Sequence, residues 1–336
     1  MKLALVACAA ALAAGCGKKS RAPLPDVTGL SAVPASAQAV VSADVATMVD
    51  SPLVQRAVDQ LLLRDRDLSS RWQQLDASCK LDPKQLDQIV LAIGPGKGTG
   101  TGPVLMVVTG KIVETELASC VRTMVGQGGG SLTAKQLGGR TLYQAKDGNR
   151  TMYFAFSEPD TVVLGSDEAY VTEALGTGKK ALDNADLAGW IKLVDPKAPM
   201  WAAGKVDERV RGGLVKLTSG QVKAGPVAMI VSANPRDGLS LDVGAVMESE
   251  QDAKTLESFA KTQLGLMAMA AQAKSLGTVV DKVTIAADKQ VVRFKAALSV
   301  DDVNQLISAL DAGGITAQDS PPATDAGSHA GAGAGP

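Results

Sequence analysis

Histidine is almost absent from this chain of 336 residues. The single histidine, His329, lies near the C-terminal end in a segment of Gly, Ala and Pro. A body without histidine excludes Ser-His-Asp and Cys-His catalytic arrangements. It also excludes zinc sites that contain histidine, and two cysteines in the body cannot make a four-cysteine site. We therefore expect no metal and no cofactor.

Aromatic residues and an excess of charge of either sign are also lacking. Aromatics make up 3% of the residues and the formal net charge is −1. No basic stripe with interleaved aromatics is present, so we expect no nucleic-acid partner. Hydrophobic residues reach 46%, which predicts a core of Val, Leu, Ile, Ala and Met.

The apolar run at the N-terminus is too short to span a bilayer as a helix. It follows Lys2 and ends in LAAGC, with the cysteine at position 16, which has the shape of a secretory signal. This segment resembles a bacterial lipobox, where signal peptidase II cuts before a cysteine that then carries lipid. The resemblance implies a signal peptide over 1–15 and lipidation of Cys16. The alternative is an ordinary signal peptide with an incidental cysteine.

Lipidation implies membrane lipid as a partner, because two or three acyl chains make a stable anchor. Gly17, and not Asp, follows Cys16. In the enterobacterial sorting pattern this favours the outer membrane. We therefore expect a lipid-anchored protein of the bacterial cell envelope.

Two cysteines remain in the body after Cys8 leaves with the signal and Cys16 takes lipid. An even pair in an exported protein is a disulfide candidate, so we expect Cys79 and Cys120 to be bonded. Cys120 lies on the apolar face of a predicted helix, and Cys79 is expected in a loop. The alternative is two unrelated buried thiols.

The chain is predicted to contain a flexible tether, two similar halves and a disordered tail. We place these at 16–37, 38–186, 198–311 and 312–336. Each half has the order strand, helix, hairpin, helix, hairpin, helix, with one extra strand in the first. Ser51-Pro52 begins one helix and Asp147-Gly148 turns one hairpin.

This order predicts the α+β class, with antiparallel sheets and helices packed on one face. The two sheets could form separate lobes or one curved sheet.

Carboxylates and glycines offer weak signals of chemistry. Asp167-Glu168 and Asp301-Asp302 could work as acid–base pairs, but each pair lies in the first turn of a predicted helix, where acids complement the helix dipole. The glycine-rich segment 94–102 lies between two strands, so it does not fit a phosphate loop. We name no catalytic residue.

The segment 264–273 is apolar nearly all round. Leu266, Met267 and Met269 could line an adaptable pocket for an apolar ligand such as a lipid tail. The alternative is a core helix wedged between the two lobes.

The run 33–41, VPASAQAVV, the region of Cys79 and the repeated plan resemble envelope lipoproteins of unknown function. That resemblance implies no activity. Our leading hypothesis is a non-enzymatic binding or scaffold module with an envelope protein partner. The alternatives are a carrier of a lipid or other apolar ligand between the lobes, and a carboxylate-based hydrolase.

Overall fold

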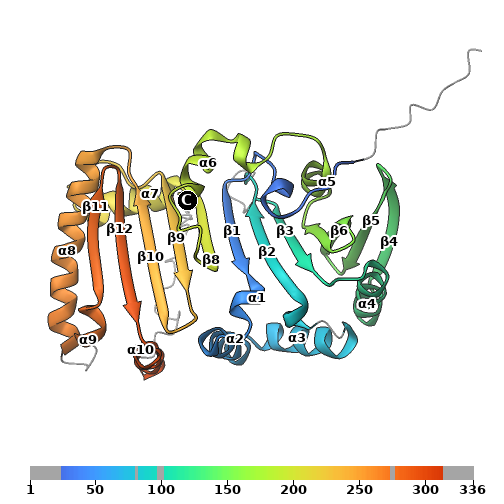
Figure 1. The fold of residues 1–336 in the computed structure, drawn as a ribbon, viewed down its shortest axis with the longest axis horizontal. Coiled ribbons are helices and arrows are strands. Elements are labelled where there is room, and N and C mark those ends of the chain that lie inside the picture. Colours follow the sequence, from blue (N-terminus) through green and yellow to red (C-terminus); the bar gives the residue numbers. More distant parts are fainter. Residues whose placement is uncertain (1–23, 80–81, 97–101, 273–276, 313–336) are drawn as a thin grey trace, which may run out of the picture.

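A computed structural model describes residues 24–79, 82–96, 102–272 and 277–312 (Figure 1). The expected signal peptide, the lipidation site Cys16 and residues 313–336 with His329 lie outside the described residues. Within the described ranges, no helix is both long and apolar enough to cross a membrane.

Twelve strands of the described chain form one continuous antiparallel sheet. Their order is β11-β12-β10-β9-β8-β1-β2-β3-β7-β6-β5-β4. The first half supplies β1 to β7 and the second half supplies β8 to β12. The halves meet where β1 pairs with β8, from Ala39 opposite Gly204 to Ala43 opposite Met200. The two halves therefore share one sheet.

The first half contains more elements than the second. In chain order they are η1 (Gly29–Ala32), β1 (Ala39–Asp44), α1 (Val45–Met48), α2 (Pro52–Arg64), α3 (Arg66–Cys79), η2 (Pro83–Gln85), β2 (Leu86–Ile93), β3 (Val104–Gly110), α4 (Glu114–Gln127), β4 (Ser131–Leu137), β5 (Arg140–Asp147), β6 (Arg150–Glu158), β7 (Thr161–Gly165), α5 (Glu168–Leu175), η3 (Ala181–Asp183) and α6 (Ala185–Ile191).

The second half repeats the plan with fewer strands. Its elements are β8 (Met200–Lys205), α7 (Glu208–Leu217), β9 (Ala228–Asn234), β10 (Leu239–Val246), α8 (Glu250–Gln272), α9 (Gly277–Val280), β11 (Val283–Asp288), β12 (Val291–Leu298) and α10 (Val300–Ala312).

The strand order confirms the predicted repetition. Outward from the centre, the first half runs β1, β2, β3, β7, β6 and the second runs β8, β9, β10, β12, β11. In both halves the third strand pairs with the last strand of the half, which pairs in turn with the strand before it. The β4 and β5 strands extend the first half beyond this common unit, and β4 is a strand that we did not predict.

Each face of the sheet has its own helices, and we name each face by one of them. The α8 face carries Val108 and Val292 and is covered by α4, α7 and α8. The α5 face carries Leu105 and is covered in the first half by α5. Trp190 and Ile191 of α6 contact the α5 face of both halves. Helices were predicted on one face of the sheet, and the structure has helices on both faces.

Local signals in the sequence explain several boundaries. The Oγ atom of Ser51 accepts a hydrogen bond from Val54 N, and Pro52 opens α2, as predicted. Gly148 turns the β5–β6 hairpin with φ of +56°, a conformation that favours glycine. The Ser51 hydroxyl also donates to the Pro235 carbonyl, 2.6 Å away in the β9–β10 connection, so α2 contacts the second half.

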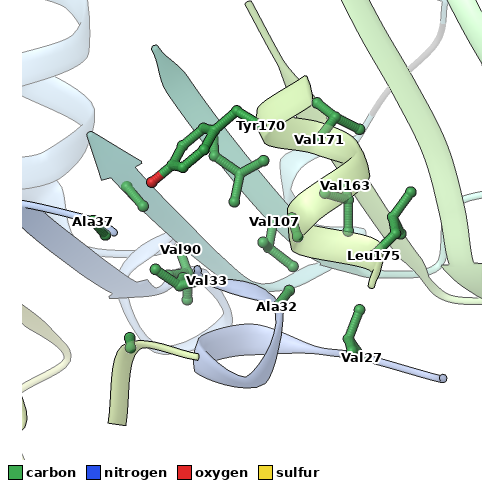
Figure 2. Close-up of a cluster of buried hydrophobic side chains, with 14 of the residues drawn as sticks. Val27, Ala32, Val33, Ala37, Val90, Val107, Val163, Tyr170, Val171 and Leu175 are labelled. Atoms are coloured by element: carbon green, nitrogen blue, oxygen red, sulfur yellow. The ribbon is translucent and has the colours of Figure 1, made fainter. Parts of the chain in front are cut away.

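Residues 24–37 form a strap that packs on the first half, which corrects the expected tether. Val27, Ala32 and Val33 are buried beside α5 (Figure 2). Arg140 donates to the Pro25 carbonyl at 2.9 Å and to Asp26 at 2.6 Å. Small residues and prolines gave the strap a linker-like composition, but its apolar side chains enter the core.

Candidate functional site

The site is built from two rows of residues that cross the α5 face, one in each half. In the first half, Val40 pairs with Ala92, Ala92 with Leu105, and Leu105 with Gly165. The second half has an equivalent row at the same distance from the centre of the β1·β8 pair. There the successive partners are Trp201, Ser232, Asp242, Lys295 and Thr284.

Charged residues replace core residues at these equivalent positions. Asp242 occupies the position of Leu105, and Lys295 that of Gly165. In the neighbouring row, Arg293 stands where the first half has Val163. Leu105 and Val163 are fully buried in the core beneath α5. The same part of the sheet is therefore apolar in one copy and charged in the other.

The helix after the last strand of each half explains why the second copy is open. In the first half α5 follows β7 and buries Tyr170, Val171 and Leu175 against the α5 face (Figure 2). In the second half α10 follows β12, but it lies at the end of the strands (Figure 1). Within the described ranges, no helix lies above the polar row of the second half (Figure 1).

Asp242 is the central charge of this open region. Its Oδ2 atom lies 3.1 Å from Arg293 Nη1 and 3.6 Å from Lys295 Nζ. Arg293 also donates to the Leu193 carbonyl at 2.8 Å, which ties the chain after α6 to the sheet. The Asp242 and Arg293 side chains are only about one quarter exposed, at 23% and 24%. The pair is therefore shielded, whereas Lys295 reaches into solvent.

The second oxygen of Asp242 is not satisfied. Its Oδ1 atom is buried and accepts no hydrogen bond from any described residue. Buried polar atoms in proteins nearly always have a hydrogen-bond partner, so this oxygen is an exception. It could accept a hydrogen bond from a donor on a ligand.

Asp242 and Lys295 line a pocket of about 390 Å³, and Arg293 contacts it through Asp242. Ser232, Ser240, Ala297 and Thr284 contribute small polar or apolar side chains, and Asp195 and Lys282 also line it. The Ser232 hydroxyl accepts from Asp195 N at 2.8 Å, which holds the connection before β8 against the sheet. A second hollow of about 320 Å³ shares Asn234 and Ser240 with it. We call the larger hollow the charged pocket.

Lys282 joins the charged pocket to α10. Its ammonium donates to Asp302, which also accepts from the Ser299 backbone N–H and hydroxyl, both at 2.7 Å. The Lys282 hydrogen bond, followed by those from Ser299, lowers the pKa of Asp302 to about 2. Asp302 is thus ionised and engaged in a helix cap.

The other carboxylate pair that we considered also has a capping role. Asp167 accepts from Tyr170 N at 2.9 Å at the start of α5. Asp301 and Glu168 lie in the first turns of α10 and α5, as expected for acids that complement a helix dipole. The structure does not bring Asp167 and Asp302 together, since they begin equivalent helices of different halves.

Cys79 and Cys120 form the predicted disulfide, with their Cα atoms 5.0 Å apart. The bond joins the last residue of α3 to α4, so Cys79 ends a helix where a loop was expected. A groove of about 570 Å³ lies between these helices, near Trp72 and Met124. None of the α3 side chains that can be described is fully buried.

Leu266, Met267 and Met269 are exposed at 51%, 60% and 64%. They lie near the end of α8, whose residues Leu256 and Leu264 pack on the α8 face at the β11 end of the sheet. This corrects the expected position between two lobes (Figure 1). An apolar ligand contact at these residues stays a prediction.

The sequence did not reveal the charged pocket. Arg293 and Lys295 alternate with Val292 and Phe294 along β12, as solvent-facing residues do on any half-buried strand. Their meeting with Asp242 depends on the register between strands. Among the described residues, no group of three or more His, Cys, Asp or Glu side chains is placed to hold a metal ion.

No protein-family model matches the chain, and no curated protein matches it in sequence. Among solved structures, it is similar to the protein described as "Structure of crystal form I of TP0453". That similarity has a TM-score of 0.47 at 10% sequence identity, and it covers 84% of this chain and 98% of the other.

Proposed function

We propose that this chain is a non-enzymatic binding module of the bacterial cell envelope, with a small polar ligand held in the charged pocket. The observation that carries the proposal is the replacement of Leu105 and Val163 by Asp242 and Arg293 at equivalent positions. In the first half α5 covers the apolar side chains at these positions, whereas in the second half the equivalent positions carry charges beside an open pocket. A partly buried ion pair adds little net stability, so a role in binding accounts better for these charges.

The proposal also includes the lipid anchor on Cys16 that the lipobox resemblance implies. Leu24 is eight positions after Cys16, which limits the reach of the chain between them to about 29 Å. A free chain up to residue 37 would reach about 75 Å. Leu24 N contacts the Gly138 carbonyl at 3.3 Å, at the β4–β5 turn. The strap therefore enters the body at the end of the sheet opposite the charged pocket (Figure 1).

A second candidate function is the carriage of a lipid or another apolar ligand. The exposed side chains of Leu266, Met267 and Met269 favour it, because exposed apolar side chains that lie together often mark a surface that binds an apolar ligand or a partner. The same surface would serve an envelope protein partner. Extraction of bound lipid from the purified protein, and its loss in a Met267→Lys, Met269→Lys variant, would distinguish this candidate from the first.

The main test is a thermal-unfolding screen of the mature chain with amino acids, short peptides and sugar phosphates. A true ligand stabilises the folded state by about 2.7 kcal/mol at a hundred times its Kd. The test variant is Asp242→Leu, Arg293→Val, which gives this part of the sheet the residues of the first half and removes the Asp242–Arg293 ion pair. We expect it to fold, because that half already holds those residues, and to lose the ligand-dependent shift.

The matched control is Glu257→Leu, Lys261→Val, which removes another partly shielded ion pair, on α8. It should keep the ligand-dependent shift. A screen in which no compound shifts the wild-type midpoint saturably would refute the pocket as a binding site. If the chain converts a compound to product and one substitution abolishes that conversion, the protein is a hydrolase and the proposal of a non-enzymatic module is wrong.

The anchor is tested separately by labelling cells with a radioactive fatty acid. We expect the wild-type chain to take the label and to sediment with membranes, because diacyl modification makes a stable anchor. Cys16→Ala should lose both properties, whereas Cys8→Ala should keep them. Label that persists in Cys16→Ala would show that the lipobox assignment is wrong.

A further inference from the structure

We infer that the charged pocket binds its ligand through an oxyanion, a carboxylate or a phosphate, seated between Lys282 and Lys295 beside the Thr284 hydroxyl. This inference rests on the proposed binding function and names the chemical class of the ligand.

Two lysines and a hydroxyl meet at the start of β11. Lys295 of β12 lies opposite Thr284 of β11, and Lys282 lies in the turn just before β11, two residues before Thr284. Both lysines line the charged pocket.

Both ammonium groups keep donors for a ligand. An ammonium group has three N–H donors. Lys282 directs one to Asp302, and Lys295 approaches Asp242 at 3.6 Å, beyond a normal hydrogen bond. Arg293 already contacts the same carboxylate at 3.1 Å. The guanidinium of Arg293 therefore engages the Oδ2 atom of Asp242, which leaves the ammonium of Lys295 directed toward solvent.

The rest of the lining limits what else could bind. No aromatic side chain is among the residues that line the charged pocket, so a sugar ring has nothing to stack on. Ser240 and Ala297 add small side chains to the lining. The volume of about 390 Å³ suits a compact polar molecule, and the Asp195 carboxylate in the lining could accept from a donor on the same ligand.

The experiment uses two simple anions with the mature chain at constant ionic strength and pH 7. Inorganic phosphate and acetate are titrated separately against chloride, while backbone amide signals are followed by nuclear magnetic resonance. We expect saturable shifts at Thr284, Lys295 and Ser240. The anion with the lower Kd distinguishes phosphate from carboxylate as the group that is recognised.

Lys295→Gln is the decisive variant, because it does not disturb the pair of Lys282 with Asp302. We expect its Kd to rise about tenfold, as for one lost charged hydrogen bond, and Lys295→Arg to restore most of the affinity. Lys282→Gln should weaken binding in the same way. Lys261→Gln removes another paired lysine, on α8, and should leave the Kd unchanged.

Equal loss in Lys261→Gln and Lys295→Gln, or shifts that never saturate, would overturn the inference in favour of general charge screening. Failure of this inference is distinct from failure of the proposed function. If neither anion binds, but a neutral or cationic compound stabilises the wild type and not Asp242→Leu, Arg293→Val, the pocket binds a ligand of another class.

Discussion

At the scale of single residues, register decides what a side chain does. Leu105 and Asp242 sit on equivalent strands with equivalent partners, and one is core while the other is a pocket charge. β3 is apolar from Val104 to Val108, whereas β10 places Ser240 and Asp242 between apolar residues. Sequence patterns therefore predicted the strands but not the pocket, because the pocket forms between strands that are far apart in the chain.

Asp302 provides a prediction at this scale. Its pKa is lowered from 3.8 to about 2 in the folded state, chiefly by the hydrogen bond from Lys282. A lowered pKa means that Asp302 stabilises the fold above pH 4 and loses this effect as the pH falls toward 2. We expect Asp302→Asn to unfold at lower urea concentration than the wild type at pH 6, with the gap narrowing by pH 2.

The exposed neighbour Asp301 supplies the control. Asp301→Asn keeps the contacts of Asp302 with Ser299 and Lys282, so its unfolding midpoint should stay nearer that of the wild type at pH 6. A gap between wild type and Asp302→Asn that is constant from pH 6 to pH 2 would contradict the assignment of the charge effect to Asp302.

At the scale of elements, regular patterns were predictable and irregular packing was not. The β5–β6 hairpin and the start of α2 followed from Asp147-Gly148 and Ser51-Pro52. The strand β4 was missed because its residues Ser131–Leu137 are mostly polar and exposed, as an edge strand can be. The strap was missed because contacts with distant strands, and not its own periodicity, give it a fixed place.

The disulfide is expected to be the main attachment of α3. Cys79 and Cys120 are 41 residues apart, and the chain-entropy model assigns about 4 kcal/mol to closing such a loop. We expect Cys79→Ser, Cys120→Ser to lower the free energy of unfolding by about that amount. Hydrogen exchange in 66–79 should speed up before exchange in the sheet does, because the helix buries little.

Reduction of the wild type provides the internal control, since it should reproduce the exchange pattern of the double variant. The reductant should leave the double variant itself unchanged. If 66–79 exchange as slowly in the double variant as in the wild type, packing against α4 holds α3 without the bond.

At the scale of the whole molecule, the β1·β8 pair makes one body of two copies. Gly204 lies against β1 so closely that a Cβ atom there would be 2.5 Å from the Ala39 Cβ. Gly204→Ala should therefore push the strands apart and destabilise the protein by about 1–3 kcal/mol. Urea unfolding followed by the fluorescence of Trp201, which lies in β8, measures the effect at the junction.

Gly213 offers a substitution of the same kind with the opposite expected sign. It lies within α7, and nothing is within 4 Å of the position that a Cβ would take. Gly213→Ala should stabilise the protein by up to about 1 kcal/mol through helix propensity. Equal effects of the two substitutions would show that the junction tolerates a wider spacing than its geometry indicates.

The strap has a mechanical consequence if Cys16 carries the proposed lipid anchor. A pulling force between Cys16 and a ligand in the charged pocket would first act on residues 24–37. There Val33 is buried and Arg140 donates a hydrogen bond to the Pro25 carbonyl. The force would then cross the apolar packing beneath α5 and the β1·β8 pair before it reached Asp242. The first half, whose core is continuous beneath α5, would carry most of this force. The second half, which holds the charged pocket, would be deformed less.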